Sequence, residues 1–477
     1  MGLRIFLRLT FSIIFSTTLL LHAEVPVKDF SGVYHATVDS VFHPKTVEEL
    51  RQIVVATKKQ VAIVGGNYSM GGQTWHQDGI VIDMSSLKAI THFDASQKTV
   101  TVQAGALWRD VQTFLLSYNL TVGIMQSFND FSVGGSLSVN VHGRDLRGQI
   151  IGSVQGLTIM LHDGSLVKAD RSEHYDLFKA VIGGYGACGI IVDATLKVDD
   201  NCHLERTMTF VPVSKFNRFF REKIKGNKKI AFFNANIYGP NYDQAVSIVW
   251  SKTDKPLTIQ HRMHHGAHGL VPHELSMQVK YALQQALSNY SYTHVLRGKF
   301  DSILMKYTNP VVWRSYAMSY PVALLDTPAH GTSKILQEYF VPVEHFEKFV
   351  DALRSVFKEH NVKALNVSIR YVPRTMESVL SYAAQHSFAF VCYVVIDNNP
   401  RGHAYAQQWT RKLIDAVLAL QGTYYLPYHL FASSDQCIKA YPRYFELRAI
   451  KNKYDPAGRF NNSLISFFEK TIARSLS

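Results

Sequence analysis

The stretch VAIVGGNYSMGGQ, residues 61–73, constrains the fold of this 477-residue chain more than any other. It holds two glycine pairs and no charged side chain. It begins within one apolar segment, 60–66, and is followed by another, 79–87, and both are predicted strands. Missing side chains let the main chain turn sharply or approach another group closely. The stretch is therefore either a glycine-rich turn or a place where the backbone contacts a phosphate group.

Two of three phosphate-binding devices do not fit this stretch. A Walker loop needs Lys and then Ser or Thr after its last glycine, whereas Gln73 and Thr74 follow here. A dinucleotide fingerprint leads into a helix, whereas QTWHQDGIVIDM predicts a turn and a strand. The third device is a nest of consecutive backbone N–H groups, which binds anions without a helix dipole. Ser69 adds a hydroxyl donor to it.

The order of the predicted elements indicates an α+β fold. Residues 41–59 predict an extended start and then a helix with Thr46 as its N-cap. Residues 132–170 are rich in glycine and run into a hairpin with an Asp-Gly turn. Strand-like and helical stretches alternate over 201–420, which predicts a second α+β unit.

Composition sets bounds on the class of protein. Hydrophobic residues make up 47% of the chain, which with its length indicates a globular protein of more than one domain. The formal charge is +13, but the basic residues are scattered and no nucleic-acid module is recognisable, so no nucleic-acid partner is expected. The 4 cysteines form no CxxC pair, and Cys392 lies in a buried-strand pattern that predicts a core thiol.

The N-terminus carries a targeting signal. Arg4 and Arg8 precede an apolar core, 9–21, and Ala23 precedes a candidate cleavage site. Residues 1–23 are therefore predicted to be a signal peptide, and the protein is predicted to be exported to the periplasm or secreted. An uncleaved membrane anchor is the alternative, although the apolar run is shorter than the ~20 residues of a typical span.

Five motifs occur in a fixed order: VGGNYSMGGQ, VTVQAGALWRDVQTFL, SVGGSLSVNVHG, LFKAVIGGYGACGIIVDATLKV and KYDPAGRFNN. Together they resemble flavoproteins of the vanillyl-alcohol oxidase and p-cresol methylhydroxylase family, nearest to its sugar-alcohol, aldonolactone and decaprenylphosphoryl-ribose oxidases. The resemblance spans roughly residues 38–465 and is dense over 60–198. It implies FAD as the cofactor.

The resemblance also implies an architecture. An FAD-binding domain of two α+β subdomains is expected over 38–200, and an α+β substrate domain that covers the flavin ring over 201–420. The last segment, 421–477, is expected to return to the FAD-binding domain. By the same resemblance, 65–73 holds the FAD pyrophosphate and the break at 189–190 contacts the cofactor.

The residues expected at the cofactor come from three of the motifs. They are Gly65, Gly66, Asn67, Tyr68, Ser69, Met70, Gly71, Gly72, Gln73, Gly134, Gly135, Ser138, His142, Gly143, Gly189 and Ile190. Members that bind flavin covalently often carry His where this chain has Tyr68. FAD is therefore predicted to bind tightly but without a covalent bond.

The segment ALNVSIRYV offers the first catalytic candidates. Its apolar and polar residues alternate, so Asn366, Ser368 and Arg370 lie on one face of a predicted strand. Either this face is in solvent, or it points at the flavin. Several sugar-oxidising relatives show an acidic-x-Arg pattern on such a strand, and Arg370 matches its arginine while Ser368 replaces the acid. A guanidinium suits a polyol or negative charge on the reduced flavin.

A second predicted strand, LQEYFV at 336–341, places Gln337 and Tyr339 on one face and Glu338 on the other. The pattern does not decide which face is inward. Gln337 and Tyr339 are predicted to face the ligand, and a buried Glu338 would be a candidate base.

His142 and three residues near the C-terminus complete the candidates. His142 in NVHG matches a histidine near the flavin ring in the ribose-oxidising relatives, where it would orient the flavin or relay a proton. Tyr425, Tyr428 and His429 either approach the flavin edge or pack between domains.

A metal site is not predicted. His264 and His268 are four residues apart, but neighbouring glycines disfavour a helix and no acidic or Cys partner is near, so an exposed loop is favoured.

The sequence therefore predicts an exported FAD-dependent oxidoreductase that oxidises a CH–OH group of a sugar, polyol or lactone, a small-molecule substrate. The electron acceptor, oxygen or another, is left open. Two alternatives remain: an FAD-binding protein of this fold without catalysis, which the missing acid at Ser368 would favour, and a basic module for anionic polymers.

Overall fold

The computed structural model describes residues 24–263, 309–322 and 331–476. The predicted signal peptide therefore lies outside the described residues. Helices and strands are mixed throughout, which confirms the predicted α+β class. Within the described ranges, no helix combines the length and apolarity needed to cross a bilayer.

The first sheet is small and parallel, with the order β3 (Ser40–Phe42), β5 (Ile80–Asp83), β4 (Val61–Val64). Helix α1 (Val47–Ala56) connects β3 to β4, and Thr46 caps it by accepting a hydrogen bond from the backbone of Glu49, as predicted. The glycine-rich stretch follows β4 and leads to β5. Because β4 and β5 are parallel, this stretch must cross from one end of the sheet to the other rather than form a tight hairpin.

A two-stranded ribbon stands at the start of the described chain. It consists of β1 (Val25–Lys28) and β2 (His35–Val38), which pair antiparallel. Val38 and Trp75 form a small separate core with Val81 of the parallel sheet, so the ribbon packs beside the glycine-rich stretch.

The second sheet is antiparallel and carries the rest of the first half of the chain. Its order is β10 (Leu166–Asp170), β9 (Val154–Met160), β11 (Ile190–Asp200), β7 (Thr99–Gln103), β6 (Ile90–Asp94), and β8 (Leu120–Val122) pairs with β11. The helices in this part are α2 (Trp108–Leu116), α3 (Val133–Ser138) and α4 (Tyr175–Val181). The predicted hairpin is formed by β9 and β10.

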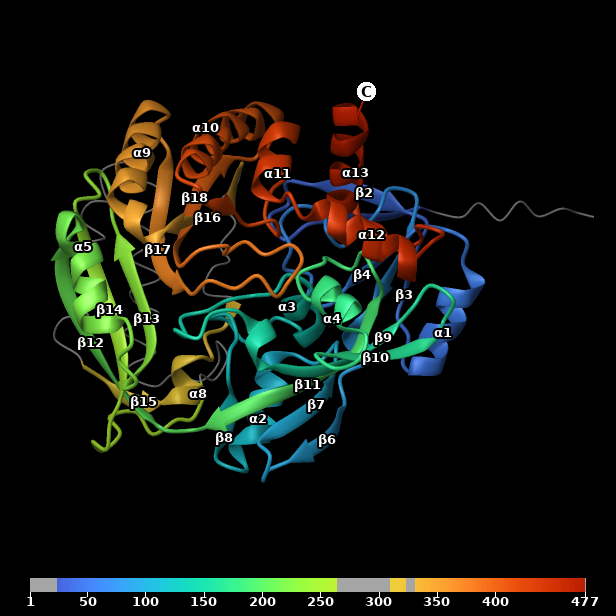
Figure 1. The fold of residues 1–477 in the computed structure, drawn as a ribbon, viewed down its shortest axis with the longest axis horizontal. Helices are drawn as coiled ribbons and strands as arrows, with labels where there is room; N and C mark the ends of the chain where they lie inside the picture. The colour runs from blue at the N-terminus through green and yellow to red at the C-terminus, as the bar shows by residue number, and fades with distance from the viewer. Residues whose placement is uncertain (1–23, 264–308, 323–330, 477) are drawn as a thin grey trace, which may run out of the picture.

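The third sheet has eight strands and spans the second half of the chain (Figure 1). Its order is β15 (Val311–Trp313), β12 (His203–Pro212), β14 (Gln244–Lys252), β13 (Ile230–Ile237), β17 (Lys363–Val372), β18 (Ser387–Asp397), β16 (Thr332–Pro342), β19 (Thr423–Tyr424). All neighbours in it are antiparallel.

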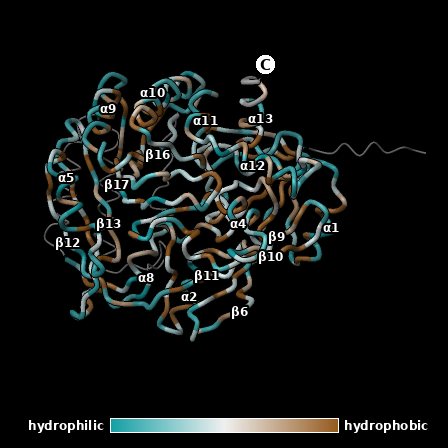
Figure 2. Tube along the Cα trace, in the orientation of Figure 1, coloured by the Kyte–Doolittle hydropathy of each residue, from teal (hydrophilic) through white to brown (hydrophobic). Residues whose placement is uncertain are grey.

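Helices cover the outer face of this sheet. They are α5 (Val213–Phe219), α9 (Phe346–Glu359) and α10 (Pro400–Ala419), whereas the short α8 (Arg314–Ala317) follows β15. Phenylalanine rings fill the space between helices and strands; Phe346, for example, stacks on Phe216 at 4.5 Å and meets Phe388 at 5.3 Å. Hydrophobic segments run through the interior, and the outer helix turns and loops are largely hydrophilic (Figure 2). The opposite face of the sheet is therefore the one left for a site.

The C-terminal segment returns to the first sheet. It contains α11 (Ser434–Ala440), α12 (Tyr444–Tyr454) and α13 (Ser463–Leu476), which lie above the N-terminal strands in Figure 1. Val61 of β4 donates its backbone N–H to Arg459 at 2.7 Å and accepts one from Asn461 at 3.0 Å. The last part of the chain thus extends the edge of the sheet that carries the glycine-rich stretch.

Candidate cofactor and active site

A cavity of about 360 Å³ lies between the glycine-rich stretch and the inner face of the eight-stranded sheet. This volume is in the range of small-molecule sites. Most of its lining is apolar. Polar groups come from the stretch after β4, from helix α3 and the segments on either side of it, from strands β16, β17 and β18, and from the C-terminal segment.

The wall formed by the glycine-rich stretch offers backbone N–H groups that can bind an anion. Asn67 has a left-handed backbone, with φ of 57°, which turns the chain within the stretch. The backbone N–H groups of Asn67 and Ser69 have no acceptor within the described part of the chain. Unsatisfied amides at a cavity wall are what a bound diphosphate would satisfy.

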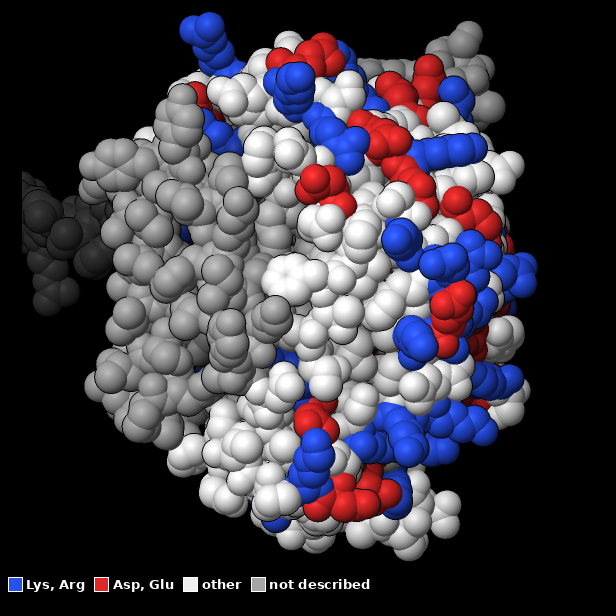
Figure 3. Space-filling view, turned by 90° about the vertical axis from the view of Figure 1, so that its left-hand side faces the viewer, with Lys and Arg blue, Asp and Glu red and all other residues white. Residues whose placement is uncertain are grey.

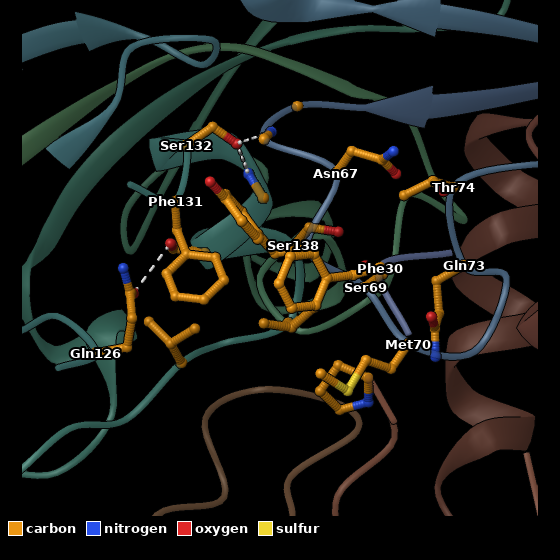
Figure 4. Close-up of a pocket in the computed structure, with 18 of the residues that line it drawn as sticks. Phe30, Asn67, Ser69, Met70, Gln73, Thr74, Gln126, Phe131, Ser132 and Ser138 are labelled. Atoms are coloured by element: carbon orange, nitrogen blue, oxygen red, sulfur yellow. Dashed lines mark hydrogen bonds between the residues drawn. The ribbon is translucent and has the colours of Figure 1, made fainter. Parts of the chain in front are cut away.

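Ser132 fixes the glycine-rich stretch to helix α3. Its Oγ accepts hydrogen bonds from the backbone of Gly66 at 3.2 Å and of Gly135 at 3.3 Å, both drawn in Figure 4. A Cβ at position 65 would lie 2.1 Å from this oxygen, so only glycine fits there without displacing Ser132. Ser132 is not among the residues that the sequence predicts at the cofactor, although it is the first residue of the SVGG motif.

Aromatic rings flank the stretch. The Tyr68 ring packs edge-on against Phe30 and Phe131, with centroids 5.1 and 4.7 Å apart. Figure 4 shows Phe30 close to Ser69 and Met70. Phe30 belongs to the turn between β1 and β2, whose contribution to the cavity the sequence did not reveal.

Thirteen of the sixteen residues expected at the cofactor line the cavity, and Gly71, Gly72 and Gly143 do not. At each of these three positions, the surrounding protein rather than a ligand favours glycine. A Cβ on Gly71 would lie 2.3 Å from the carbonyl of Tyr428, and one on Gly143 would lie 2.1 Å from that of Met125. Gly72 has φ of 72° and faces Ser463.

The opposite wall holds a buried acid–base pair. His142 Nε2 lies 2.6 Å from Glu338 Oε1, and both side chains are at most 2% exposed. Tyr428 donates to the second carboxylate oxygen, Oε2, at 3.2 Å. An ionised carboxylate only accepts hydrogen bonds, so when Glu338 is ionised, His142 donates through Nε2. The other ring nitrogen, Nδ1, has no partner among the described residues.

The face of strand β16 that points at the cavity is not the predicted one with Gln337 and Tyr339 but the opposite one. Leu336 and Glu338 line the cavity, whereas Gln337 and Tyr339 lie on the helix-covered face. The Tyr339 ring is fully buried 5.5 Å from Phe349 of α9. The prediction that Gln337 and Tyr339 face the ligand is therefore corrected: alternation along the strand gave the two faces, but both were buried and only packing chose between them.

Strand β17 presents the predicted polar row. Asn366, Ser368 and Arg370 all line the cavity. The strand register places Ser368 opposite Val391 of β18, and Val391 opposite Glu338 of β16. Ser368 and Glu338 therefore occupy one cross-strand row on the same face, with a single strand between them.

The C-terminal segment contributes two tyrosines. Tyr425 and Tyr428 line the cavity, and burial raises the pKa of both phenols well above the usual range. His429 does not line it. Its Nε2 lies 2.9 Å from Ser31 Oγ, and burial lowers its pKa to about 3.

Metal chemistry has no support in this part of the molecule. No cluster of His, Cys, Asp or Glu suited to a metal ion occurs among the residues that the structure describes. His264 and His268 lie outside those residues. Cys392 is fully buried, as predicted, and all four cysteines are free thiols.

Residues 38–170 match the family of FAD binding domains. Residues 38–170 therefore form an FAD binding domain, and the cofactor of the protein is FAD. Three features fit this cofactor: the unsatisfied backbone amides, the glycines that let a ligand approach the backbone, and the apolar cavity.

The match to curated relatives covers part of each chain. The chain is 27% identical over 187 residues to L-gulonolactone oxidase of Mus musculus, which is 38% of this chain and 42% of the relative. It is 28% identical over 207 residues to cytokinin dehydrogenase 1 of Arabidopsis thaliana, 41% and 36% of the two chains. With D-arabinono-1,4-lactone oxidase of Yarrowia lipolytica, it shares 29% over 177 residues, 36% and 34%. The chain thus spans less than half the length of these relatives.

Proposed function

We propose that this protein is an FAD-dependent oxidoreductase that oxidises a CH–OH group of a sugar, polyol or lactone. The carrying observation is the Glu338–His142 pair, because it places a carboxylate with a fixed partner on the wall facing the FAD-binding stretch. The lactone oxidases among the relatives support the same reaction class.

Each group at this wall has a part in the reaction. FAD, when bound, would supply the acceptor for the hydride that leaves the substrate carbon. Glu338 accepts the proton of the substrate hydroxyl, and the carbon is left as a carbonyl. His142 and Tyr428 hold the two carboxylate oxygens in place by donating to them. The carboxylate has four lone-pair sites, so it can also accept from the substrate hydroxyl.

Glu338 would also take the place of the acid that several sugar-oxidising relatives carry at the position of Ser368. A carboxylate in the same cross-strand row serves the same end of the cavity as one at position 368 would. The alternative of an FAD-binding protein without catalysis loses its main support for this reason.

The layout of domains follows from the same proposal. Residues 38–200 would hold FAD, 201–420 would bind the substrate, and 421–477 would complete the cavity with its tyrosines. Export rests on the sequence of residues 1–23, and N-terminal sequencing of the protein from cell fractions tests it.

A module for anionic polymers is not favoured. On the face of the molecule seen in Figure 3, Lys and Arg stand among Asp and Glu instead of forming an unbroken basic surface. Such a module would also have no use for a buried acid–base pair.

The experiment is an anaerobic absorbance screen of the purified yellow protein against aldoses, polyols and lactones, followed by air. Bleaching of the flavin identifies a substrate, and the speed of recolouring separates an oxidase from a dehydrogenase. A flavin that no member of these three classes bleaches would overturn the proposal. Acid denaturation should release all of the flavin, because Tyr68 cannot form the histidyl bond; flavin retained on the protein would contradict non-covalent binding.

A further inference from the structure

Arg370 is a cation at the cavity wall that has no anionic partner among the described residues. It lines the cavity from β17, and no hydrogen bond or ion pair joins it to another residue in the described part of the chain. Its Nε is buried and has no acceptor there. Buried guanidinium nitrogens are normally paired, so this one is available to a ligand.

The acids near the cavity are already engaged. Glu338 accepts from His142 and Tyr428, and it forms no ion pair with Arg370 within 4 Å. Asp145 is paired with Arg147 at 2.7 Å and with Arg314 at 3.0 Å. These acids leave Arg370 uncompensated.

Two more arginines, Arg144 and Arg206, add positive charge near Arg370. Arg144 lies between the rings of Phe232 and Tyr320, 5.5 Å from each centroid. Burial lowers the pKa of Arg144, Tyr320 opposes this change, and the positive charges of Arg370 and Arg206 lower it further. Arg144 and Arg206 do not line the cavity, but their charges add to the positive potential near Arg370, and positive potential attracts anions.

The positions of Glu338 and Arg370 define two ends of a binding site. Arg370 pairs with Ala389 of β18, two residues from Val391, which pairs with Glu338. Two strand spacings of about 4.8 Å and a rise of about 6.6 Å separate the two Cα atoms by roughly 12 Å. Both side chains lie on the same face, so they bracket a space for one small molecule.

The groups between these ends suit hydroxyl groups. Asn366 and Ser368 line the cavity in the same polar row as Arg370, and the amide oxygen of Asn366 is buried without a donor in the described ranges. A hydroxylated chain or ring could donate to it and accept from the Asn366 amide and the Ser368 hydroxyl.

We propose that the substrate is an anionic sugar or polyol, whose carboxylate or phosphate group binds Arg370 while the hydroxyl to be oxidised lies at Glu338. The proposal rests on the oxidoreductase function above and narrows its substrate class. A planar guanidinium can bind either anion through two parallel hydrogen bonds.

The test compares matched charged and neutral compounds on the FAD-loaded protein. The carboxylate arm uses gluconate and glucuronate, the phosphate arm uses glucose 6-phosphate, and glucose and sorbitol are the neutral members. Anaerobic flavin reduction gives kcat and KM for each, and calorimetry measures binding independently of turnover. An anionic compound is expected to have a KM at least tenfold below its neutral counterpart.

Arg370→Gln is the variant, and Arg374→Gln is its control. Arg374 is exposed four residues further along and donates to the carbonyl of Ala384 at 3.0 Å, outside the cavity. Arg370→Gln should raise KM and the calorimetric dissociation constant of the anionic compound 10- to 100-fold. The neutral compound should change less than threefold, and Arg374→Gln should change neither.

Each result points to a different conclusion. Equal losses for charged and neutral compounds would mean that Arg370 acts on the reduced flavin, and the anion site would fall while the oxidoreductase stands. Equal KM values in the unmodified protein would do the same. Binding of anions that depends on Arg370, with no flavin reduction by any compound, would sustain the anion site and remove the proposed function.

Discussion

His142 and His429 are both buried near a carboxylate, and their surroundings differ. His142 touches Glu338 directly, at 2.6 Å, on the wall of the cavity. His429 lies 3.9 Å from Asp29, and Ser31 Oγ stands between them, 2.9 Å from His429 Nε2 and 2.8 Å from Asp29 Oδ2. Both pairs are almost completely buried and both join distant segments.

The comparison shows that burial of an acid–base pair does not mark a site. Asp29 also accepts backbone hydrogen bonds from Val33 and Tyr34, so its charge is used to hold the turn between β1 and β2. Glu338 accepts only from side chains and has capacity left at a cavity. The His142–Glu338 pair would therefore take part in the reaction, whereas the His429–Asp29 pair connects the N-terminal ribbon to the C-terminal segment.

The largest expected effect comes from removing the charge of each acid in turn. Glu338→Gln should slow anaerobic flavin reduction by about 10²- to 10⁴-fold, the usual contribution of a general base. Asp29→Asn, the matched change at the other pair, should stay within about threefold, because it lies away from the cavity. Stopped-flow absorbance measures both. A slow Asp29→Asn variant with normal flavin content would erase the distinction between the pairs.

The second effect is on stability as a function of pH. Burial lowers the pKa of His429 to about 3, so the folded protein keeps this ring neutral. Its contribution is complete above the ordinary pKa of 6.5 and is lost as the pH falls towards 3. The loss reaches about 2 kcal/mol at pH 5, from 1.36 kcal/mol per pH unit. Asp29 has a pKa raised by burial, so its contribution has the opposite sign and is lost as the pH rises.

Urea unfolding at pH 7 and pH 5 measures this difference. The decrease in unfolding free energy between the two pH values should be smaller by about 2 kcal/mol in His429→Gln than in the unmodified protein. His92→Gln, at an exposed strand position, should keep the original decrease. An unchanged decrease in His429→Gln would show that this histidine does not control acid stability.

The smallest effect concerns the bridging hydroxyl. Ser31→Ala removes the donor to Asp29 and leaves two buried polar groups facing each other, at a cost of about 1 kcal/mol or somewhat more. Ser96 has the same spacing from Asp94 but is exposed, so Ser96→Ala should cost less than about 0.5 kcal/mol. Flavin reduction should be normal in both. A loss of activity in Ser31→Ala alone would connect the ribbon to the reaction.

Much of the cofactor wall could be predicted because it depends on local sequence. Glycine at positions 65, 66, 134 and 135 is legible in the sequence, and all four line the cavity. Gly71 and Gly143 look the same in the sequence, yet a Cβ there would meet the backbone of other segments. Sequence alone does not distinguish a glycine that a ligand approaches from one that another part of the chain approaches.

The catalytic wall was predicted less completely, for a related reason. Period-two alternation placed Arg370 on the polar face of its strand, and that face is the inner one. In β16, both faces are buried, so polarity gave no direction and Gln337 and Tyr339 were chosen over Glu338. Tyr428 and Phe30 reach the cavity from segments nearly 400 residues apart.

By itself, the sequence determined the α+β class, the FAD-binding motifs and the polar row of β17, because these follow from side-chain periodicity and from where side chains are missing. Only the tertiary structure decided that Glu338 meets His142, that His429 contacts Ser31, and that Arg370 has no partner among the residues that the structure describes. Such pairings depend on which distant segments pack together, and a buried charge acquires its role from the groups that surround it.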